Sequence, residues 1–153
     1  MKQWWQTMRD WCLERLRWRG KRRLTPRMQT GRAGERHAAA HLRAQGWGIV
    51  ARNWQNGRDE IDIVARDGPS LVFIEVKTRA STGAVDEAGM GYFAVNARKR
   101  RALSRACRAY LSGLASKPAH FRFDIIEVKI KGDGTHELVH HRGIPLFPKH
   151  YRP

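Results

Sequence analysis

The sequence predicts an α/β domain with a mixed central β-sheet flanked by helices. Two amphipathic helical patterns and five short apolar runs follow one another in the order helix, three strands, helix, two strands. The second and third strands are apolar on both faces, which is typical of strands covered on both sides. At 153 residues, the chain is long enough for one domain with a substantial core.

The first 28 residues form a basic, tryptophan-rich extension, with nine basic and two acidic side chains. Trp4, Met8, Trp11 and Trp18 recur at helical spacing, and a basic helix with such a face can lie on a membrane or on nucleic acid. A leader docked on the domain through its tryptophans, or an overextended start, fits equally well. We therefore expect an extension over 1–28 and an α/β domain over 29–153, joined by a basic linker over Gly20 to Pro26.

A helix is predicted from Thr30 to Gln45, with Thr30 as its N-cap and Gly46 as its stop. Glu35 shares one face with apolar residues that follow at helical spacing, namely Ala38, Ala39 and Leu42. An acid on this packing face can reach the rim of the sheet and join a metal shell through water. The simpler alternative is a first-turn acid that offsets the helix dipole. His37 and His41 lack a third zinc ligand at a recognisable spacing and are read as solvent-facing or phosphate-contacting.

The most informative segment is a β-hairpin that follows a first strand over Trp47 to Trp54. Its turn is Asp67-Gly68-Pro69-Ser70, and an antiparallel register centred there places Asp62 opposite Glu75. Opposed residues have Cβ atoms roughly 4.5–5.5 Å apart, close enough for both carboxylates to bind one cation. Glu75 and Lys77 should share a face with Leu71 and Phe73, and Ile61, Ile63 and Ala65 should share the opposite face of their strand.

Charged side chains in this apolar setting predict a metal-dependent hydrolytic site. Burying a charge costs free energy unless the charge is paired or bound to metal. Oxygen ligands suit Mg²⁺ (or Mn²⁺), so Asp62 and Glu75 are the expected ligands. Lys77 could position the water that the metal acidifies or neutralise the charge of the transition state. The alternative is a structural ion pair in which Lys77 only neutralises Glu75 or Asp62.

A second strong helix is predicted over Val95 to Leu111. Lys99 lies within its apolar stripe, where it either points toward the site or snorkels past the sheet. Four arginines form a row on the solvent side that no acid balances, and with Arg79 they are expected to contact phosphates, although a charge run can also be a solvated face. These four are Arg98, Arg101, Arg105 and Arg108. The segment from Ala80 to Met90 is expected to be a loop or short helix near the site.

The last predicted strands run from Phe121 to Lys129 and from His136 to His141, joined by the turn Lys131-Gly132-Asp133-Gly134. Asp124 is read as a structural acid paired with an arginine. The net charge of +16 points to polyanionic partners, with nucleic acid first and anionic membrane second. Cys12 and Cys107 form no metal or redox motif, and neither a secretory signal nor a membrane-spanning run is recognised, so a cytoplasmic location is expected.

Together these motifs resemble the YraN-like family of predicted endonucleases, within the PD-(D/E)xK nuclease superfamily and related to Holliday junction resolvases. The matching pieces lie between Thr30 and Phe147. They are Gly31-Arg32-Ala33-Gly34-Glu35 with Ala39, Leu42 and Gly46; Arg52-Asn53; Glu60 to Ala65; Val72 to Arg79; Lys99, Leu103, Ala106 and Tyr110-Leu111; and Arg122 to Ile126. Asp59 departs from the family pattern, which has Gly there, and the segment from Ala80 to Phe93 matches poorly.

The resemblance implies a restriction-endonuclease-like core that acts on DNA with Mg²⁺. It implies Glu35 as the helix acid, Asp62 and Glu75 as metal ligands, and Lys77 as the catalytic lysine. A structure-selective endonuclease is therefore expected, with no small-molecule cofactor. The alternative is a non-catalytic DNA- or RNA-binding protein that keeps the fold, and a third reading is a membrane-surface protein that uses the Trp4 to Trp18 helix. Symmetric cleavage of two strands would favour a homodimer, although the sequence identifies no dimer surface.

Overall fold

The computed structural model describes residues 25–81, 96–148 and 151 of the chain. The secondary structure begins with helix α2 (Pro26–Ala44) and strands β1 (Gly48–Asn56), β2 (Asp59–Asp67) and β3 (Ser70–Ala80). Helix α3 (Ala97–Ser112) and strands β4 (His120–Ile130) and β5 (His136–His141) complete it. This is the predicted order of elements.

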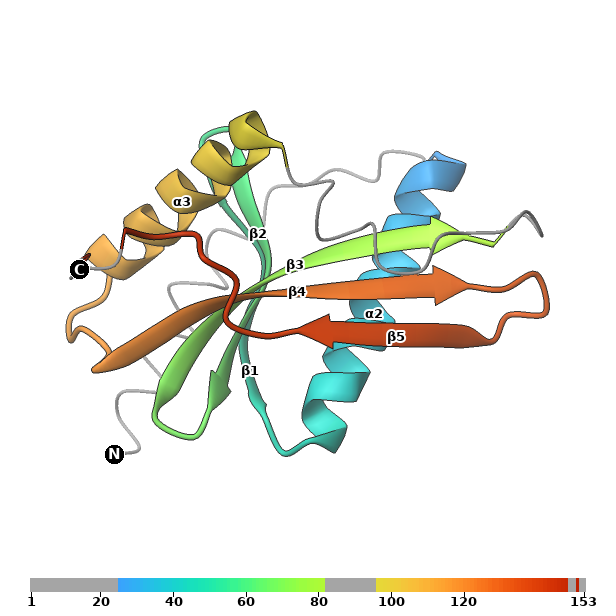
Figure 1. Cartoon of the computed structure of the whole chain (residues 1–153), viewed down its shortest axis with the longest axis horizontal. Helices are drawn as coiled ribbons and strands as arrows, with labels where there is room; N and C mark the ends of the chain where they lie inside the picture. Colours follow the sequence, from blue (N-terminus) through green and yellow to red (C-terminus); the bar gives the residue numbers. More distant parts are fainter. Residues whose placement is uncertain (1–24, 82–95, 149–150, 152–153) are drawn as a thin grey trace.

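The five strands form one mixed sheet in the spatial order β1-β2-β3-β4-β5. Strands β1, β2 and β3 form an antiparallel meander, β3 pairs with β4 in parallel, and β5 returns antiparallel to β4. The parallel step requires a crossover, and α3 lies within it. In Figure 1, α2 and α3 lie on opposite faces of the sheet. The predicted α/β class with a mixed, helix-flanked sheet is confirmed, and it is compatible with a restriction-endonuclease-like core.

Helix α2 begins earlier than predicted. Its N-cap is Thr25, whose hydroxyl accepts a hydrogen bond from the Met28 amide at 3.3 Å, and Pro26 follows at the first helical position. Proline is well suited to that position because its φ is already helical and its missing N–H would have no partner there. The prediction of Thr30 as the N-cap is wrong, since the Thr30 hydroxyl lies inside the helix and donates to the Pro26 carbonyl. Glu35 therefore lies well beyond the first turn, which removes the helix-dipole explanation for it.

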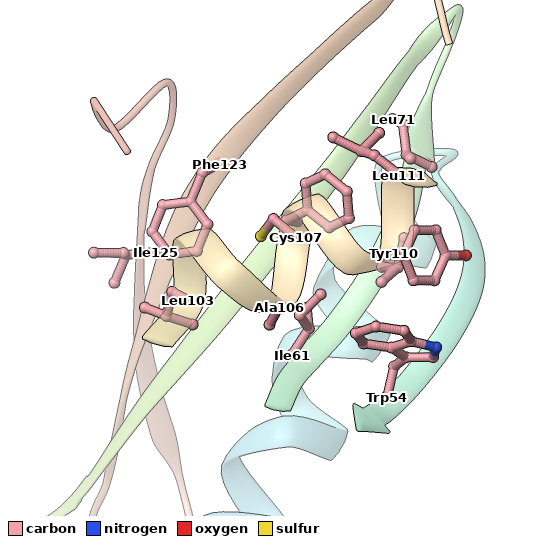
Figure 2. Packing of buried hydrophobic residues seen from close by; sticks show 12 residues of the cluster. Trp54, Ile61, Leu71, Leu103, Ala106, Cys107, Tyr110, Leu111, Phe123 and Ile125 are labelled. Atoms are coloured by element: carbon pink, nitrogen blue, oxygen red, sulfur yellow. The ribbon is translucent and has the colours of Figure 1, made fainter. Parts of the chain in front are cut away.

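The face of the sheet under α3 carries the larger hydrophobic cluster. Leu103, Ala106, Cys107, Tyr110 and Leu111 of α3 pack on residues of β2, β3 and β4. Figure 2 shows Tyr110 next to Trp54, and their ring centroids are 5.2 Å apart in an edge-to-face arrangement. Leu71 and Phe73 belong to this cluster, as expected for the face that they share with Glu75 and Lys77.

The opposite face is covered by α2, which packs directly against the sheet. Ala38, Ala39 and Leu42 form a cluster with Ile63, Ala65, Val72 and Ile74. The closest approach is at Gly34, where an added Cβ atom would lie 1.8 Å from the Thr78 hydroxyl oxygen. Only glycine allows this contact between helix and strand, and the contact places the adjacent Glu35 at the rim of the sheet.

The predicted hairpin register is confirmed up to a break at Asp62. The paired residues run from Asp67 with Ser70 to Ile63 with Ile74, and the backbone pairing ends there. The expectation that Ile61 shares a face with Ile63 is wrong, because Ile61 packs in the α3 cluster and Ile63 in the α2 cluster. In the neighbouring strand, Asn53 lies between Arg52 and Trp54, the partners of Ile63 and Ile61, and adopts the left-handed conformation with a φ of 49°. Strand β1 also shifts register between Ile49 and Ala51.

The remaining expectations divide between described and undescribed residues. Helix α3 begins at Ala97 after the N-cap Asn96, whose side chain accepts from the Lys99 amide at 2.9 Å. Residues 1–24 of the predicted extension, and most of the expected segment from Ala80 to Met90, lie outside the described residues. The last residues of the predicted extension, from Pro26 to Met28, belong to α2.

Candidate active site

Charged side chains from four elements meet where the β2–β3 pairing ends. Glu35 comes from α2, Asp62 from β2, Glu75 and Lys77 from β3, and Lys99 from α3. The close packing of Gly34 on Thr78 positions α2, and the shared hydrophobic cluster positions α3. The structure therefore brings together every residue that the sequence suggested for the chemistry, and it adds Lys99.

Glu75 is the centre of this group and is only 3% exposed. Its Oε1 atom lies 2.7 Å from Lys77 Nζ and 3.0 Å from Lys99 Nζ. Its Oε2 atom is buried and has no hydrogen-bond partner among the described residues. A buried carboxylate oxygen without a partner is costly, so this atom is a ready ligand for a cation.

Asp62 lies beside Glu75 and is 8% exposed. Its Oδ2 atom accepts a hydrogen bond from the Val76 amide at 2.7 Å, so the carboxylate replaces the backbone bond that the ladder would otherwise make. Burial, together with the negative charge of Glu75, raises the pKa of Asp62 to about 8. The Val76 hydrogen bond and the charge of Lys99 oppose this shift, and Glu35 adds to it. A buried Asp62 carboxyl beside the Glu75 carboxylate forms a site suited to a positive ion.

Glu35 is held over the same region by the irregular part of β1. Its Oε2 atom accepts a hydrogen bond from the Asn53 side chain at 2.7 Å and lies 3.7 Å from an Arg52 guanidinium nitrogen. Asn53 lies between Arg52 and Trp54, the β1 partners of Ile63 and Ile61, and has a left-handed backbone. In the sequence, Arg52-Asn53 stands out only as a matching piece of the resemblance. No local pattern shows that these residues orient the helix acid.

The donor set fits a hard cation that keeps part of its water shell. Among residues 25–81, 96–148 and 151, no three His, Cys, Asp or Glu side chains converge to form a complete cage. Mg²⁺ needs no such cage, because it commonly binds through one or two carboxylates and retains several waters. Asp62 and the unpartnered oxygen of Glu75 meet this requirement, whereas zinc would need more nitrogen or sulfur ligands.

The two lysines carry more positive charge than one carboxylate needs. The ion pair of Lys77 with Glu75 is the contact that the simpler interpretation anticipates. Lys99 brings a second ammonium group to the same oxygen. Burial opposes the charged form of Lys99, but the ion pair with Glu75 outweighs it and raises the pKa of Lys99. The sequence signals for this contact were the position of Lys99 within an apolar helical stripe and its place among the matching pieces of the resemblance.

The predicted phosphate-contacting arginines differ in their surroundings. Arg98, Arg101 and Arg79 are exposed and form no ion pair within the described part of the chain. Arg105 donates two hydrogen bonds to Asp59, at 2.8 and 2.9 Å, and the Arg108 guanidinium lies 4.7 Å from the centre of the Tyr151 ring. Asp59, the departure from the family pattern, thus binds an arginine of the row.

Asp124 is a structural acid, as expected. It is fully buried and accepts hydrogen bonds from the Gly143 amide and from Arg122, with His140 at 3.0 Å. Although burial opposes its ionisation, these contacts lower its pKa. The two histidines of α2 lie next to histidines of β5: His37 stacks on His136, and His41 lies near His140.

Comparison with known proteins places these residues in a family context. The profile of the uncharacterised protein family UPF0102 matches residues 34–128, which include Glu35, Asp62, Glu75, Lys77 and Lys99. A UPF0102 protein of Symbiobacterium thermophilum is 44% identical over 106 residues, covering 69% of this chain and 86% of its own. A UPF0102 protein of Porphyromonas gingivalis is 44% identical over 78% of this chain and 86% of its own, and one of a Parafrankia species is 43% identical over 74% and 92%. The expected YraN-like resemblance is confirmed. None of the helices within the described ranges has the length and apolar character needed to span a bilayer.

Proposed function

The chain belongs to the uncharacterised protein family UPF0102, and from its buried carboxylate site we propose that it is a Mg²⁺-dependent endonuclease acting on structured DNA. The observation that carries the proposal is the pair Asp62 and Glu75, buried side by side with one Glu75 oxygen unpartnered and two ammonium groups adjacent. A purely structural role would favour fewer charges and complete pairing. Phosphodiester hydrolysis uses this combination of cation ligands and fixed positive charge.

Each residue then has a distinct role. Asp62 and Glu75 hold the cation, which when bound polarises the phosphate and acidifies a water molecule. Lys77 stabilises the negative charge that develops on the phosphate, and Glu35, oriented by Asn53, holds a proton or a water at the edge of the site. The exposed Arg79, Arg98 and Arg101 bind the sugar–phosphate backbone without reading bases, which fits selection by shape rather than by sequence.

The second candidate is a nucleic-acid-binding protein that does not cut. The contacts of Lys77 and Lys99 with Glu75 favour it, because they partly neutralise the carboxylate without any metal. In this case the basic surface would still bind DNA or RNA. We place either activity in the cytoplasm, where the buried free thiol of Cys107 would remain reduced.

A cleavage assay on branched and flap DNA with Mg²⁺ or Mn²⁺ tests the proposal. We expect metal-dependent nicking that falls by at least about 10²-fold in Glu75→Ala and in Lys77→Ala, while DNA binding persists. Glu137→Ala is the matched control, since Glu137 is exposed in β5 and pairs with Lys131. Cleavage unchanged in both site variants would contradict the proposal, and binding without cleavage by the wild type would favour the second candidate.

A further inference from the structure

One oxygen of Glu75 contacts two ammonium groups, which come from different elements of the fold. Lys77 reaches Oε1 from the same strand, at 2.7 Å, and Lys99 reaches it from α3, at 3.0 Å. Lys77 already pairs with this carboxylate from within β3, and the charge of Lys99 acts on Asp62 as well as on Glu75. Like charges at this range oppose each other, so the Lys99 ammonium group opposes the entry of another cation at these two acids.

Lys99 is the more easily released of the two lysines. It lies in the first turn of α3, its side chain is 38% exposed compared with 29% for Lys77, and its contact with Glu75 is the longer one. Its neighbours Arg98 and Arg101 are exposed on the same helix, so Lys99 lies at the border between the carboxylate site and the basic surface. An ammonium group in this place can leave Glu75 without disturbing the core.

We propose that Lys99 is an internal counter-ion that competes with divalent cations for Glu75 and sets their affinity for the carboxylate site. The inference rests on the proposed function insofar as Asp62 and Glu75 are the ligands of the cation. It assigns Lys99 a positioning role that differs from that of Lys77, since Lys99 acts on occupancy of the site by the cation rather than on the phosphate. Removal of its charge should therefore strengthen metal binding, the opposite of what loss of a supporting residue would do.

The test is a titration of the full-length protein with Mn²⁺, in which the free ion is measured by electron paramagnetic resonance without any nucleic acid. We expect Lys99→Met to bind Mn²⁺ at least about tenfold more tightly than wild type, because one unit charge at this range shifts even the proton affinity of a carboxylate by about one to three powers of ten. Lys99→Arg keeps the charge and should remain close to wild type. Lys131→Met is the matched control, since Lys131 pairs with Glu137 and lies six residues beyond Ile125, the β4 partner of Glu75.

Equal or weaker Mn²⁺ binding by folded Lys99→Met would overturn the inference. The fold of each variant is checked by circular dichroism and thermal unfolding, and Lys99→Gln replaces Lys99→Met if the latter does not fold. If the wild type cleaves DNA in a metal-dependent way and Lys99→Met leaves the Mn²⁺ affinity unchanged, only this inference is overturned. No Mn²⁺ binding by any variant would overturn both this inference and the proposed nuclease, whereas tighter binding by Lys99→Met without cleavage by wild type would overturn the nuclease only.

Discussion

Asp62 shows how a residue that we propose as a cation ligand can also be a structural hydrogen-bond acceptor. Its carboxylate takes the place of a backbone acceptor toward Val76, which ends the β2–β3 ladder and opens the sheet beside Glu75. Sequence reasoning predicted that these two acids would face each other, because the turn fixes the register. It did not predict that the side chain of Asp62 would itself accept from the Val76 amide, since the register of a hairpin places residues opposite each other but does not specify hydrogen bonds from side chain to backbone.

The raised pKa of Asp62 predicts an unusual pH dependence of stability in the absence of metal. The folded protein retains a proton on Asp62 up to a pH of about 8, while the unfolded chain loses it near pH 3.8. Between these values the folded state binds more protons, so its free energy of unfolding decreases as the pH rises. Asp62→Asn keeps an acceptor for Val76 and should become more stable relative to wild type from pH 5 to pH 9, by about 2 kcal/mol or more.

The measurement is urea unfolding in EDTA at several pH values. Asp133→Asn serves as the control, because Asp133 is an exposed turn residue whose pKa is lowered by its hydrogen bonds with Thr135. Its ionisation therefore changes the free energy of unfolding only at acidic pH, below the range from pH 5 to pH 9. A stability difference between Asp62→Asn and wild type that does not change from pH 5 to pH 9 would show that Asp62 ionises normally in the folded protein.

At the level of secondary-structure elements, the sequence predicted order and register well and helix boundaries less well. The turn at Gly68-Pro69 and the alternating apolar residues determine the hairpin, and the structure follows them. The start of α2 differs from the prediction because Thr25, not Thr30, is followed by a proline. Proline fits the first helical position, so the helix begins there. The contact between Lys99 and Glu75 depends on how α3 crosses the sheet, a long-range property that helical periodicity does not contain.

The contact between α2 and β3 leads to a prediction at this scale. Gly34→Ala would place a methyl group against Thr78 and should lower the free energy of unfolding by about 1–3 kcal/mol through overpacking. Gly31→Ala in the same helix should instead be stabilising by about 0.5–1 kcal/mol, because no atom lies within 4 Å of the added carbon. Thermal or urea unfolding of the two variants measures the difference.

The double variant Gly34→Ala, Thr78→Gly completes this experiment. The side-chain atoms of Thr78 are the nearest obstacles to the new methyl group. When Thr78 is already Gly, the change Gly34→Ala should therefore lower the free energy of unfolding by less than it does in the wild type. If the loss in Gly34→Ala were the same with and without the Thr78 side chain, the helix–strand contact would not be its cause.

At the scale of the whole molecule, the net charge is +16, and within the described ranges some of the arginines that contribute to it are already paired with acids. Arg105 is bound to Asp59 and Arg122 to Asp67 and Asp124, whereas Arg98 and Arg101 are exposed along α3. The sequence predicted a row of four arginines on the solvent side of this helix, and all four of that row are exposed. It could not predict which of them is already paired, because Asp59 lies far away in the chain.

We therefore expect DNA affinity to depend strongly on salt, with Arg98 and Arg101 as contributors. Arg98→Ala and Arg101→Ala should each weaken binding regardless of sequence and reduce the slope of log affinity against log salt by about 1. Arg43→Ala is the control, because Arg43 is equally exposed but lies on α2, across the sheet from α3. Fluorescence anisotropy over a range of salt concentrations provides the slopes, and equal slopes in all four proteins would exclude the α3 surface as the binding face.

The irregularity of β1 also has a consequence for self-association. The margins of the described sheet are β1, interrupted by its register shift and by Asn53, and β5, which is only six residues long. Interrupted or short edge strands are poor templates for the addition of a strand from another molecule. Two copies that cut opposite strands of a junction would therefore meet through side chains rather than by extending one continuous sheet.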